Sequence, residues 1–290
     1  MNIITMPINP DIFHIGSFTI AWHGVFTALA VLTGILVPAR LARSRGLSAD
    51  RVYDIALWAV PGGIVGARLV HVIDYWSFYT ANPGRIIAIN EGGLAIWGAI
   101  LGGVITGVAY ARIKKLPVLQ YMDVIAFGLV LAQAVGRIGD VINGEHIASA
   151  SNLPWAFVYS HPNSPSFGLA PQHPAVLYEL LMDMGILGLL WWQSKRPWPA
   201  GSLFFIYFSA YSLGRFLLSF LRTDKEYLGL TEAQIISLVG LLVGVGFLVY
   251  LYLRPPSHAA ETARPEPAEG EAAPTGGATR QTRTGKGKAR

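Results

Sequence analysis

The chain has 290 residues, of which 52% are hydrophobic and 13% are charged, and its mean hydropathy is +0.44. Soluble globular proteins carry about 25% charged residues, so this composition argues against an ordinary soluble domain. The sequence contains no cysteine, which excludes a disulfide scaffold, an iron–sulfur site, a thiolate metal site and a cysteine nucleophile within the chain.

Apolar segments, each about 20 residues long and thus able to cross a bilayer, recur along the sequence. They are Phe18–Val37, Val52–Ile73, Leu94–Ala111, Val124–Ile142, Ala175–Gln193, Leu203–Phe220 and Ile235–Leu253. This pattern predicts an all-α, polytopic membrane protein with seven transmembrane helices. Glycines inside the second and third segments, such as Gly66 and Gly98, are expected to let membrane helices pack closely.

The distribution of Lys and Arg predicts the orientation of these helices. Most basic residues outside the spans lie in the first, third and fifth connections and in the C-terminal stretch, whereas the opposite loops hold Arg85, Arg222 and Lys225. Basic loops face the cytoplasm, so we expect the N-terminus outside and the C-terminus inside.

The composition changes after the last apolar segment. Residues 255–290 are rich in Pro, Gly, Ala, Glu and Thr, contain no aromatic residue and end in a basic run. Such a stretch buries too little apolar surface to fold alone. We therefore divide the chain into a membrane domain over residues 1–254 and a disordered cytoplasmic tail over residues 255–290. The basic end is expected to lie in water or on anionic membrane lipids, and no nucleic-acid partner is predicted.

Three arginines, Arg68, Arg137 and Arg215, fall inside the apolar spans, where a charge costs about 2.5–3.5 kcal/mol and usually marks a functional site. The predicted topology places all three in the outer half of the membrane, with Arg222 just beyond. The planar guanidinium binds phosphate bidentately, so this grouping favours an anion site, with a phospholipid headgroup as the natural ligand. Alternatively, each arginine reaches outward or pairs with a buried acid. The available acids are Asp123, Asp140, Glu145, Glu179 and Asp183.

The richest polar segment is Gly136–His146, at the outer end of the fourth span. Gly139 and Gly144 are expected to loosen the helix there and leave backbone groups that a cavity-lining site would satisfy. The following stretch, within a region of about 144–173, is long for a simple connection, which favours a functional cap. An ordinary extracellular loop is the alternative.

The Gly136–His146 segment resembles the signature of the phosphatidylglycerol–prolipoprotein diacylglyceryl transferases, Gly-Arg-x-Gly-Asn-x-x-Asn-x-Glu-x-x-Gly. Other stretches resemble the same family in the same order. They are Trp22-His23-Gly24, Gly66-Ala67-Arg68, residues 91–98, Gln172-His173-Pro174 with Leu177-Tyr178-Glu179, residues 211–215 and Phe220-Leu221-Arg222. The resemblance covers roughly residues 15–253, and seven helices with the N-terminus outside agree with it.

The resemblance implies an enzyme of the bacterial cytoplasmic (inner) membrane. Such an enzyme passes the diacylglyceryl group of phosphatidylglycerol to the lipobox cysteine thiol of a preprolipoprotein, forming a thioether and releasing glycerol 1-phosphate. Its substrates are thus phosphatidylglycerol and preprolipoprotein signal peptides. No cofactor is implied. The histidines are scattered without a metal-binding pattern, so no metal is expected either.

Candidate site residues follow from the arginines and from the matched motifs together. Arg137 and Arg215 are the first choices for a phosphate clamp and Arg222 and Arg68 the second, because the leaving phosphate needs nearby positive charge. By resemblance, Asn143 and Glu145 hold the headgroup, with Asp140 and Trp97 in the same pocket. Tyr211 lies one turn before Arg215 and is a catalytic candidate. The base that deprotonates the thiol is left open among His, Tyr and carboxylate side chains, and His23 and His146 lead among the histidines.

The sequence also departs from the family pattern inside the matched motifs. Asp140 replaces an Asn, Ala148 a Gly, His23 a Tyr and Ser219 a Glu, and Trp97 stands where some members have His. These departures support an alternative hypothesis. In it, the protein is a non-catalytic paralogue that binds or moves lipid and keeps only the arginine pocket.

Overall fold

The computed structural model describes residues 3–16, 18–89, 92–224, 226–227 and 229–253. Within these residues, seven helices are long and apolar enough to cross a membrane, as predicted. They are α1 (Trp22–Ser44), α2 (Ala49–Asp74), α4 (Ile96–Ile113), α5 (Val118–Asn143), α6 (Ala175–Gln193), α7 (Ser202–Leu218) and α8 (Glu232–Leu253). The chain is therefore a multi-pass membrane protein. The predicted tail over residues 255–290 lies outside the described residues.

The helix boundaries agree best where the apolar run ends sharply, as at α6, and differ most at α1. That helix begins at Trp22 rather than Phe18, because Phe18–Ala21 forms strand β3, which pairs antiparallel with β2 (Asp11–Ile15). It also continues beyond Val37 to Ser44. Pro38 lies inside the helix and is buried where α5 has Gly128, a position at which any side chain would collide with the proline ring.

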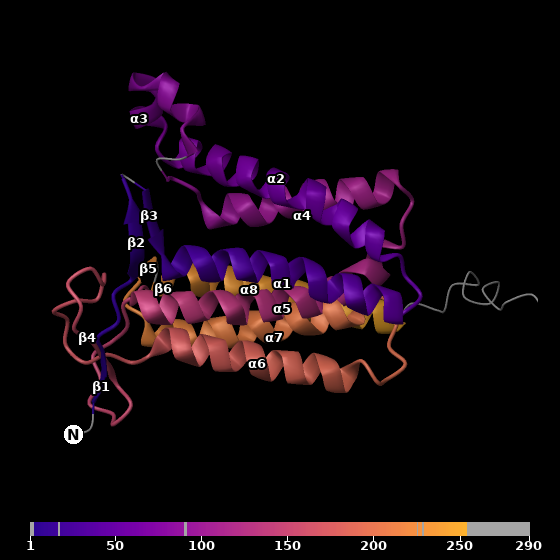
Figure 1. Cartoon of the computed structure of the whole chain (residues 1–290). Coiled ribbons are helices and arrows are strands. Elements are labelled where there is room, and N and C mark those ends of the chain that lie inside the picture. The colour runs from indigo at the N-terminus through magenta and orange to yellow at the C-terminus, as the bar shows by residue number, and fades with distance from the viewer. Residues whose placement is uncertain (1–2, 17, 90–91, 225, 228, 254–290) are drawn as a thin grey trace, which may run out of the picture. The chain divides into compact units, whose positions relative to one another are not determined.

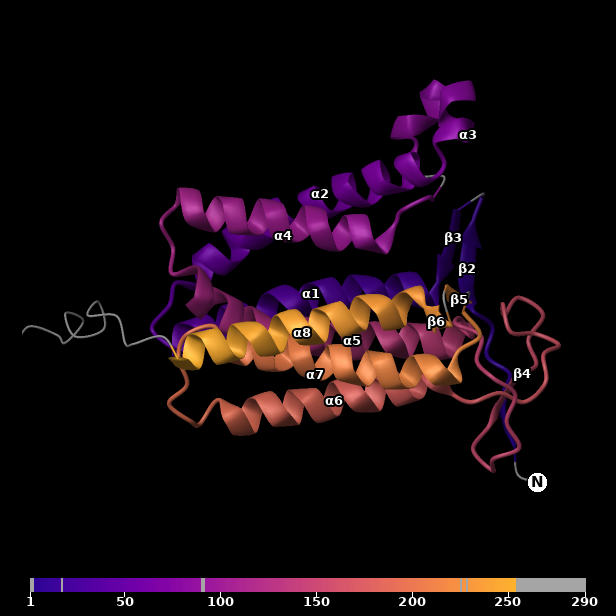
Figure 2. The same ribbon diagram turned by 180° about the vertical axis from the view of Figure 1, so that it is seen from behind.

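Two groups of helices make up the membrane domain (Figures 1 and 2). One is a bundle in which α1 packs along α5, α7 along α8, and α6 beside both α5 and α7. The other is the antiparallel pair of α2 and α4, which lies apart from the bundle over most of its length. The two groups meet in a core of small and apolar side chains that includes Ala42, Val52, Ala111 and Tyr121.

The α2–α4 pair is held by glycines at its contact. A Cβ added at Gly66 would strike the backbone carbonyl of Gly98, and one at Gly102 would strike the carbonyl of Gly62. Backbones this close gain dispersion contacts that membrane helices use in place of a hydrophobic driving force. The predicted packing role of these glycines is confirmed.

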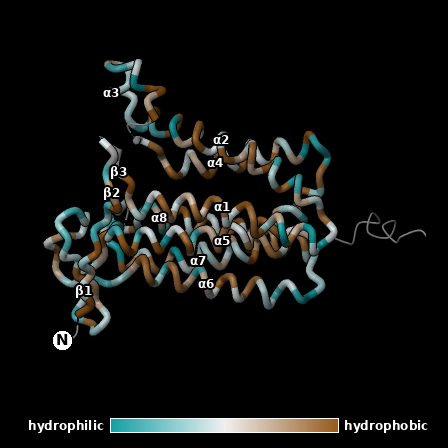
Figure 3. The backbone as a smooth tube through the Cα atoms, viewed as in Figure 1, coloured by the Kyte–Doolittle hydropathy of each residue, from teal (hydrophilic) through white to brown (hydrophobic). Residues whose placement is uncertain are grey.

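Short elements that the sequence analysis did not predict gather at one end of the helices, here called the cap end. They are β1 (Ile4–Met6), β2, β3, α3 (Trp76–Ala81), η1 (Pro83–Ile87), β4 (Phe157–Tyr159), η3 (Ser219–Leu221), β5 (Glu226–Tyr227) and β6 (Leu230–Thr231). Strand β1 pairs parallel with β4, with Ile4 opposite Phe157, and β5 pairs antiparallel with β6. Hydrophilic residues concentrate at the cap end and in the connections, while the helices between them are largely hydrophobic (Figure 3).

The cap end closes over the end of α5. The sequence predicts that Gly139 and Gly144 both loosen this helix, and the structure differs at Gly139. The helix runs unbroken through Gly139 and ends only at Gly144, whose φ of +76° suits glycine. Three hydroxyl groups of the cap then donate to the last carbonyls. Tyr159 donates to the carbonyl of Val141 (2.8 Å), Ser164 to Asn143 (2.9 Å) and Ser166 to Gly144 (2.6 Å).

Candidate active site

Three arginines converge on one buried carboxylate at the cap end of the bundle. Glu179 of α6 is 1% exposed. Its Oε2 lies 2.6 Å from Nη2 of Arg137 on α5, and its Oε1 accepts from Nη1 of Arg215 on α7. Nη1 of Arg222, just after η3, lies 3.5 Å from the same Oε1. We call Arg137, Arg215, Arg222 and Glu179 the arginine cluster.

The guanidinium groups of this cluster retain donors for a further anion. Each arginine has five N–H donors, yet within the described residues the side chain of Arg215 is bonded only to Glu179. Nη1 of Arg222 is buried and makes no hydrogen bond in that part of the chain, although its Nε donates to Asp224 (2.8 Å). The carboxylate offsets the mutual repulsion of the guanidiniums, and the spare donors suit an oxygen-rich anion such as phosphate.

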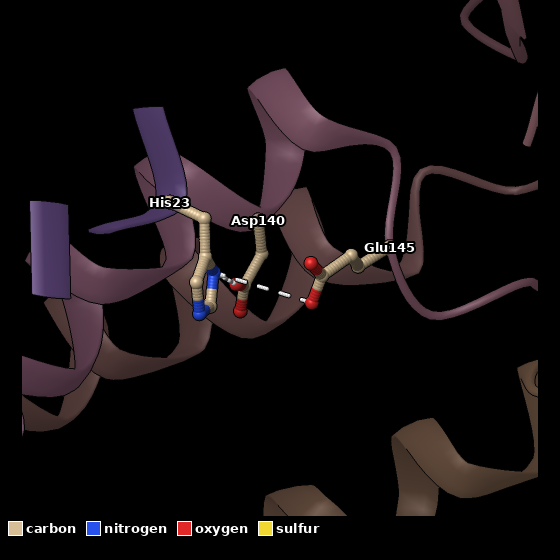
Figure 4. A group of neighbouring side chains, drawn as sticks. All are labelled: His23, Asp140 and Glu145. Atoms are coloured by element: carbon tan, nitrogen blue, oxygen red, sulfur yellow. Dashed lines mark hydrogen bonds and ion pairs between the residues drawn. The ribbon is translucent and has the colours of Figure 1, made fainter. Parts of the chain in front are cut away.

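A second carboxylate, Asp140, extends the cluster toward α1. Its Oδ2 accepts from Nη1 of Arg137 (2.9 Å), and its Oδ1 lies 2.8 Å from Nδ1 of His23, the second residue of α1. Figure 4 shows His23, Asp140 and Glu145 turned toward one another. The contact depends on Gly139, because a side chain there would crowd His23 and its neighbour Phe26.

The loop after α5 adds an amide and a third acid. Nδ2 of Asn143 donates to Oε1 of Glu145 (2.6 Å), and Oε2 of Glu145 lies 4.0 Å from Nδ1 of His23. Oδ1 of Asn143 is buried and has no hydrogen-bond partner among the described residues. The predicted residues Arg137, Asp140, Asn143, Glu145, Arg215, Arg222 and His23 therefore form one continuous group. Tyr211 lies one turn before Arg215, within electrostatic range of Arg137.

His146 completes the group on the cap side, and its surroundings disfavour its protonated form. Its Nε2 lies 3.7 Å from Oδ2 of Asp140, and its Nδ1 accepts from Nη2 of Arg222 (3.1 Å). Burial first, and the positive charge of Arg222 second, lower the pKa of His146 below its ordinary value. Conversely, the hydrogen bond from Arg222 lowers the pKa of the Asp224 carboxyl.

Two predicted residues lie outside this group, on the α2–α4 pair. Arg68 uses its Nε, Nη1 and Nη2 groups in five hydrogen bonds to backbone carbonyls. Those carbonyls belong to Arg85, Ile86, Ala88, Gly92 and Gly93. Since a guanidinium has five N–H donors, none is left for a ligand. Trp97 lies in the first turn of α4 and is partly exposed.

A divalent cation is the other ligand type to weigh at this site. His23, Asp140 and Glu145 offer ligand atoms within 4.8 Å of one another. However, Asp140 already accepts from Arg137, whose positive charge would repel a cation. The donor set therefore fits hydrogen-bonded proton chemistry better than a metal.

Glu179 is the central residue that the sequence analysis did not place in the site. The sequence marks it only as one of several acids able to pair with an arginine and as part of the matched stretch Leu177-Tyr178-Glu179. Its position inside a transmembrane span could have identified it, because an ionisable residue there is costly whether it is acidic or basic. Sequence alone could not show that three arginines from separate segments share this single acid.

Comparison with known protein families shows which family the chain belongs to. The family model described as prolipoprotein diacylglyceryl transferase matches residues 10–250. The chain belongs to this family. Curated family members named phosphatidylglycerol–prolipoprotein diacylglyceryl transferase include one from Nostoc sp., 39% identical over 254 residues (84% of this chain and 90% of the relative). Another, from Clostridioides difficile, is 37% identical over 240 residues (82% and 94%). A third, from Gloeobacter violaceus, is 36% identical over 252 residues (84% and 93%).

Membership confirms the resemblance that the sequence motifs indicated, over nearly the same span of residues. The prolipoprotein diacylglyceryl transferase match includes α1 to α7 and most of α8. It therefore contains every residue of the arginine cluster, together with His23 and Asp140.

Proposed function

We propose that this membrane transferase moves the diacylglyceryl group of phosphatidylglycerol to the lipobox cysteine of a prolipoprotein, forming a thioether and releasing glycerol 1-phosphate. The observation that carries the proposal is the convergence of Arg137, Arg215 and Arg222 at the cap end. In a family of phosphatidylglycerol–prolipoprotein diacylglyceryl transferases, such a cluster is suited to a phosphate leaving group.

The arginine cluster would act on the bond that breaks. When the carbon–oxygen bond between glyceryl and phosphate opens, negative charge develops on the phosphate, and fixed guanidinium donors stabilise that charge. Arg137 and Arg215 are assigned this role first. Arg222 is assigned second, and its buried Nη1 has no hydrogen-bond partner among the described residues, so its N–H groups can bind the phosphate. Arg68 is left out of the clamp, since its donors are all engaged.

The remaining site residues are assigned to positioning and to the acceptor. Asn143 and Glu145 bond to each other at the end of α5 and would hold the headgroup near the cluster. Tyr211 lies on α7 one turn before Arg215, and Trp97 would border the lipid from α4. The attacking sulfur must come from the substrate, because this chain has no cysteine.

The side of the membrane on which the site lies is inferred from the uneven distribution of basic residues between the loops. The cap end joins the helices on the side with few basic residues, so it is assigned to the outer face of the bacterial inner membrane. There, phosphatidylglycerol arrives from the surrounding lipid and the lipobox from a preprolipoprotein signal peptide anchored in the same membrane.

Transfer by the purified protein tests this proposal. Phosphatidylglycerol and a lipobox peptide should give a thioether-linked product together with glycerol phosphate, and a Cys→Ser peptide should give neither. Arg137→Ala should lose transfer while the protein stays inserted and folded. A folded wild-type sample that binds phosphatidylglycerol and yields no product would instead identify a non-catalytic lipid-binding paralogue.

A further inference from the structure

His23 and Asp140 form a pair that the phosphate clamp does not explain. They come from helices α1 and α5, and their closest atoms, Nδ1 and Oδ1, are 2.8 Å apart. The side chain of His23 is 44% exposed, whereas that of Asp140 is 9% exposed. An accessible imidazole is thus fixed to a buried acid, which is the arrangement of an oriented base.

The hydrogen bonds determine which ring nitrogen carries the proton. Asp140 also accepts from Nη1 of Arg137 at 2.9 Å, so it is an ionised carboxylate and both of its oxygens are acceptors. Nδ1 of His23 must therefore donate to Asp140, and the lone pair of the neutral ring resides on Nε2. Nε2 has no hydrogen-bond partner in the described part of the chain, and no dashed line reaches it in Figure 4.

We propose, on the basis of the transferase function above, that His23 is the general base of the reaction and that Asp140 is its positioning residue. Nε2 takes the proton from the lipobox thiol. The sulfur lone pair then forms the carbon–sulfur bond to the glyceryl carbon, and the electron pair of the breaking carbon–oxygen bond leaves with the phosphate. The proton on His23 passes to the departing phosphate or to water, which restores the neutral ring.

The charges around His23 support this assignment. Asp140 faces the ring from α5, and Oε2 of Glu145 lies 4.0 Å from Nδ1 from the loop after α5. Both acids favour the imidazolium that forms when the thiol gives up its proton. Arg137 and His146 contact Asp140 rather than the ring of His23. The positive charge of Arg137 is therefore separated from the base by the Asp140 carboxylate.

A substitution series measured at the chemical step tests the base. His23→Gln keeps a hydrogen-bonding side chain and removes the basic nitrogen, so single-turnover transfer should fall by about 10²–10⁴-fold while phosphatidylglycerol still binds. Its remaining rate should rise with pH toward the ordinary thiol pKa of about 8.5, and added imidazole should restore part of the rate to His23→Ala. The matched control is His14→Gln, which removes an exposed histidine that also lies beside an acid, Asp11, and should react like the wild type.

Asp140→Asn tests the positioning role through the pH profile. Loss of the carboxylate should move the acidic limb of the rate profile to lower pH and reduce kcat more than it changes KM for phosphatidylglycerol. An unchanged profile would assign Asp140 to structure alone and overturn its positioning role.

Three results separate this inference from the proposed function. A wild-type protein without thioether product contradicts the function itself. An active wild type with an unchanged rate in His23→Gln contradicts only the base. Loss of wild-type activity on chelation, with recovery on adding a divalent cation, would replace the base by a metal held at His23, Asp140 and Glu145.

Discussion

The arginines of the two helix groups carry the same charge in similar sequence surroundings and yet have different partners. Arg68 on α2 gives all five donors to the backbone carbonyls of residues 85, 86, 88, 92 and 93 and so holds the chain between α3 and α4. Arg137 and Arg215 in the bundle face carboxylates and keep donors unused. The partner decides the role, because backbone carbonyls saturate a guanidinium while a shared acid orients several guanidiniums and leaves donors for a ligand.

The largest expected effect comes from removing the shared acid. Glu179→Ala leaves three guanidiniums without their common carboxylate, and breaking such a buried pair costs about 3–5 kcal/mol of the unfolding free energy. Thermal unfolding of the purified protein in detergent measures this loss. Asp224→Ala is the control, because its half-exposed carboxylate pairs with Arg222 alone and should cost at most about 1 kcal/mol. Equal losses in the two variants would contradict a central role for Glu179.

Arg215 tests whether the cluster needs geometry or only charge. Arg215→Ala should lower the transfer rate by about 10²–10³-fold, as does removal of one fixed donor to a developing negative charge. Arg215→Lys should recover only part of that loss, since an ammonium cannot reproduce a bidentate contact. Single-turnover transfer with saturating lipid measures both variants. Full activity of the Lys variant would mean that a point charge suffices.

Arg68 should behave as a structural residue. Arg68→Ala removes the charged donor from the partly buried carbonyls that it binds between α2 and α4 and should lower the unfolding free energy by about 2–3 kcal/mol. The transition temperature records this effect, and protease accessibility near residues 85–89 should increase. A normal transition temperature would show that the loop is held by other contacts.

The smallest effect is a pH dependence of stability that arises at His146. Burial and Arg222 lower the pKa of His146, so below about pH 6.5 the unfolded chain binds a proton that the folded protein does not. Stability should therefore fall as the pH decreases through this range. The change should be at most about 1 kcal/mol, because a third of the side chain is exposed. The transition temperature of His146→Gln should change less between pH 7.5 and 5.5 than that of the wild type, and parallel curves would contradict the assignment.

The sequence predicts the seven spans well because each depends on a local property, an apolar run of bilayer length. It predicts the start of α1 less well, since Phe18–Ala21 is apolar but pairs with β2 instead of joining the helix. The reading of Gly139 as a helix-loosening residue was wrong for a similar reason. That glycine makes room for α1 at His23, a contact between residues more than one hundred positions apart.

The sequence indicates most residues of the candidate group, though not Glu179, and it does not indicate the contacts between them. Charge inside a span identified Arg68 and Arg137 equally, and only tertiary contacts separate the saturated guanidinium from the one with free capacity. The pairing of His23 with Asp140 was likewise hidden. The matched motifs mark each of them as a departure from the family pattern, and in the structure the two side chains contact each other.

The affinity for phosphatidylglycerol of Arg137→Ala and Arg68→Ala, compared in the same detergent with the wild type, tests the central claim most directly. The arginine cluster at Glu179 should be the lipid phosphate site. Arg137→Ala should therefore weaken binding by roughly 10- to 100-fold, the equivalent of about 1.5–3 kcal/mol for a charged hydrogen bond, while folded Arg68→Ala binds as the wild type does. Unchanged affinity in Arg137→Ala together with lost affinity in Arg68→Ala would contradict the account and place the headgroup at the α2–α4 pair.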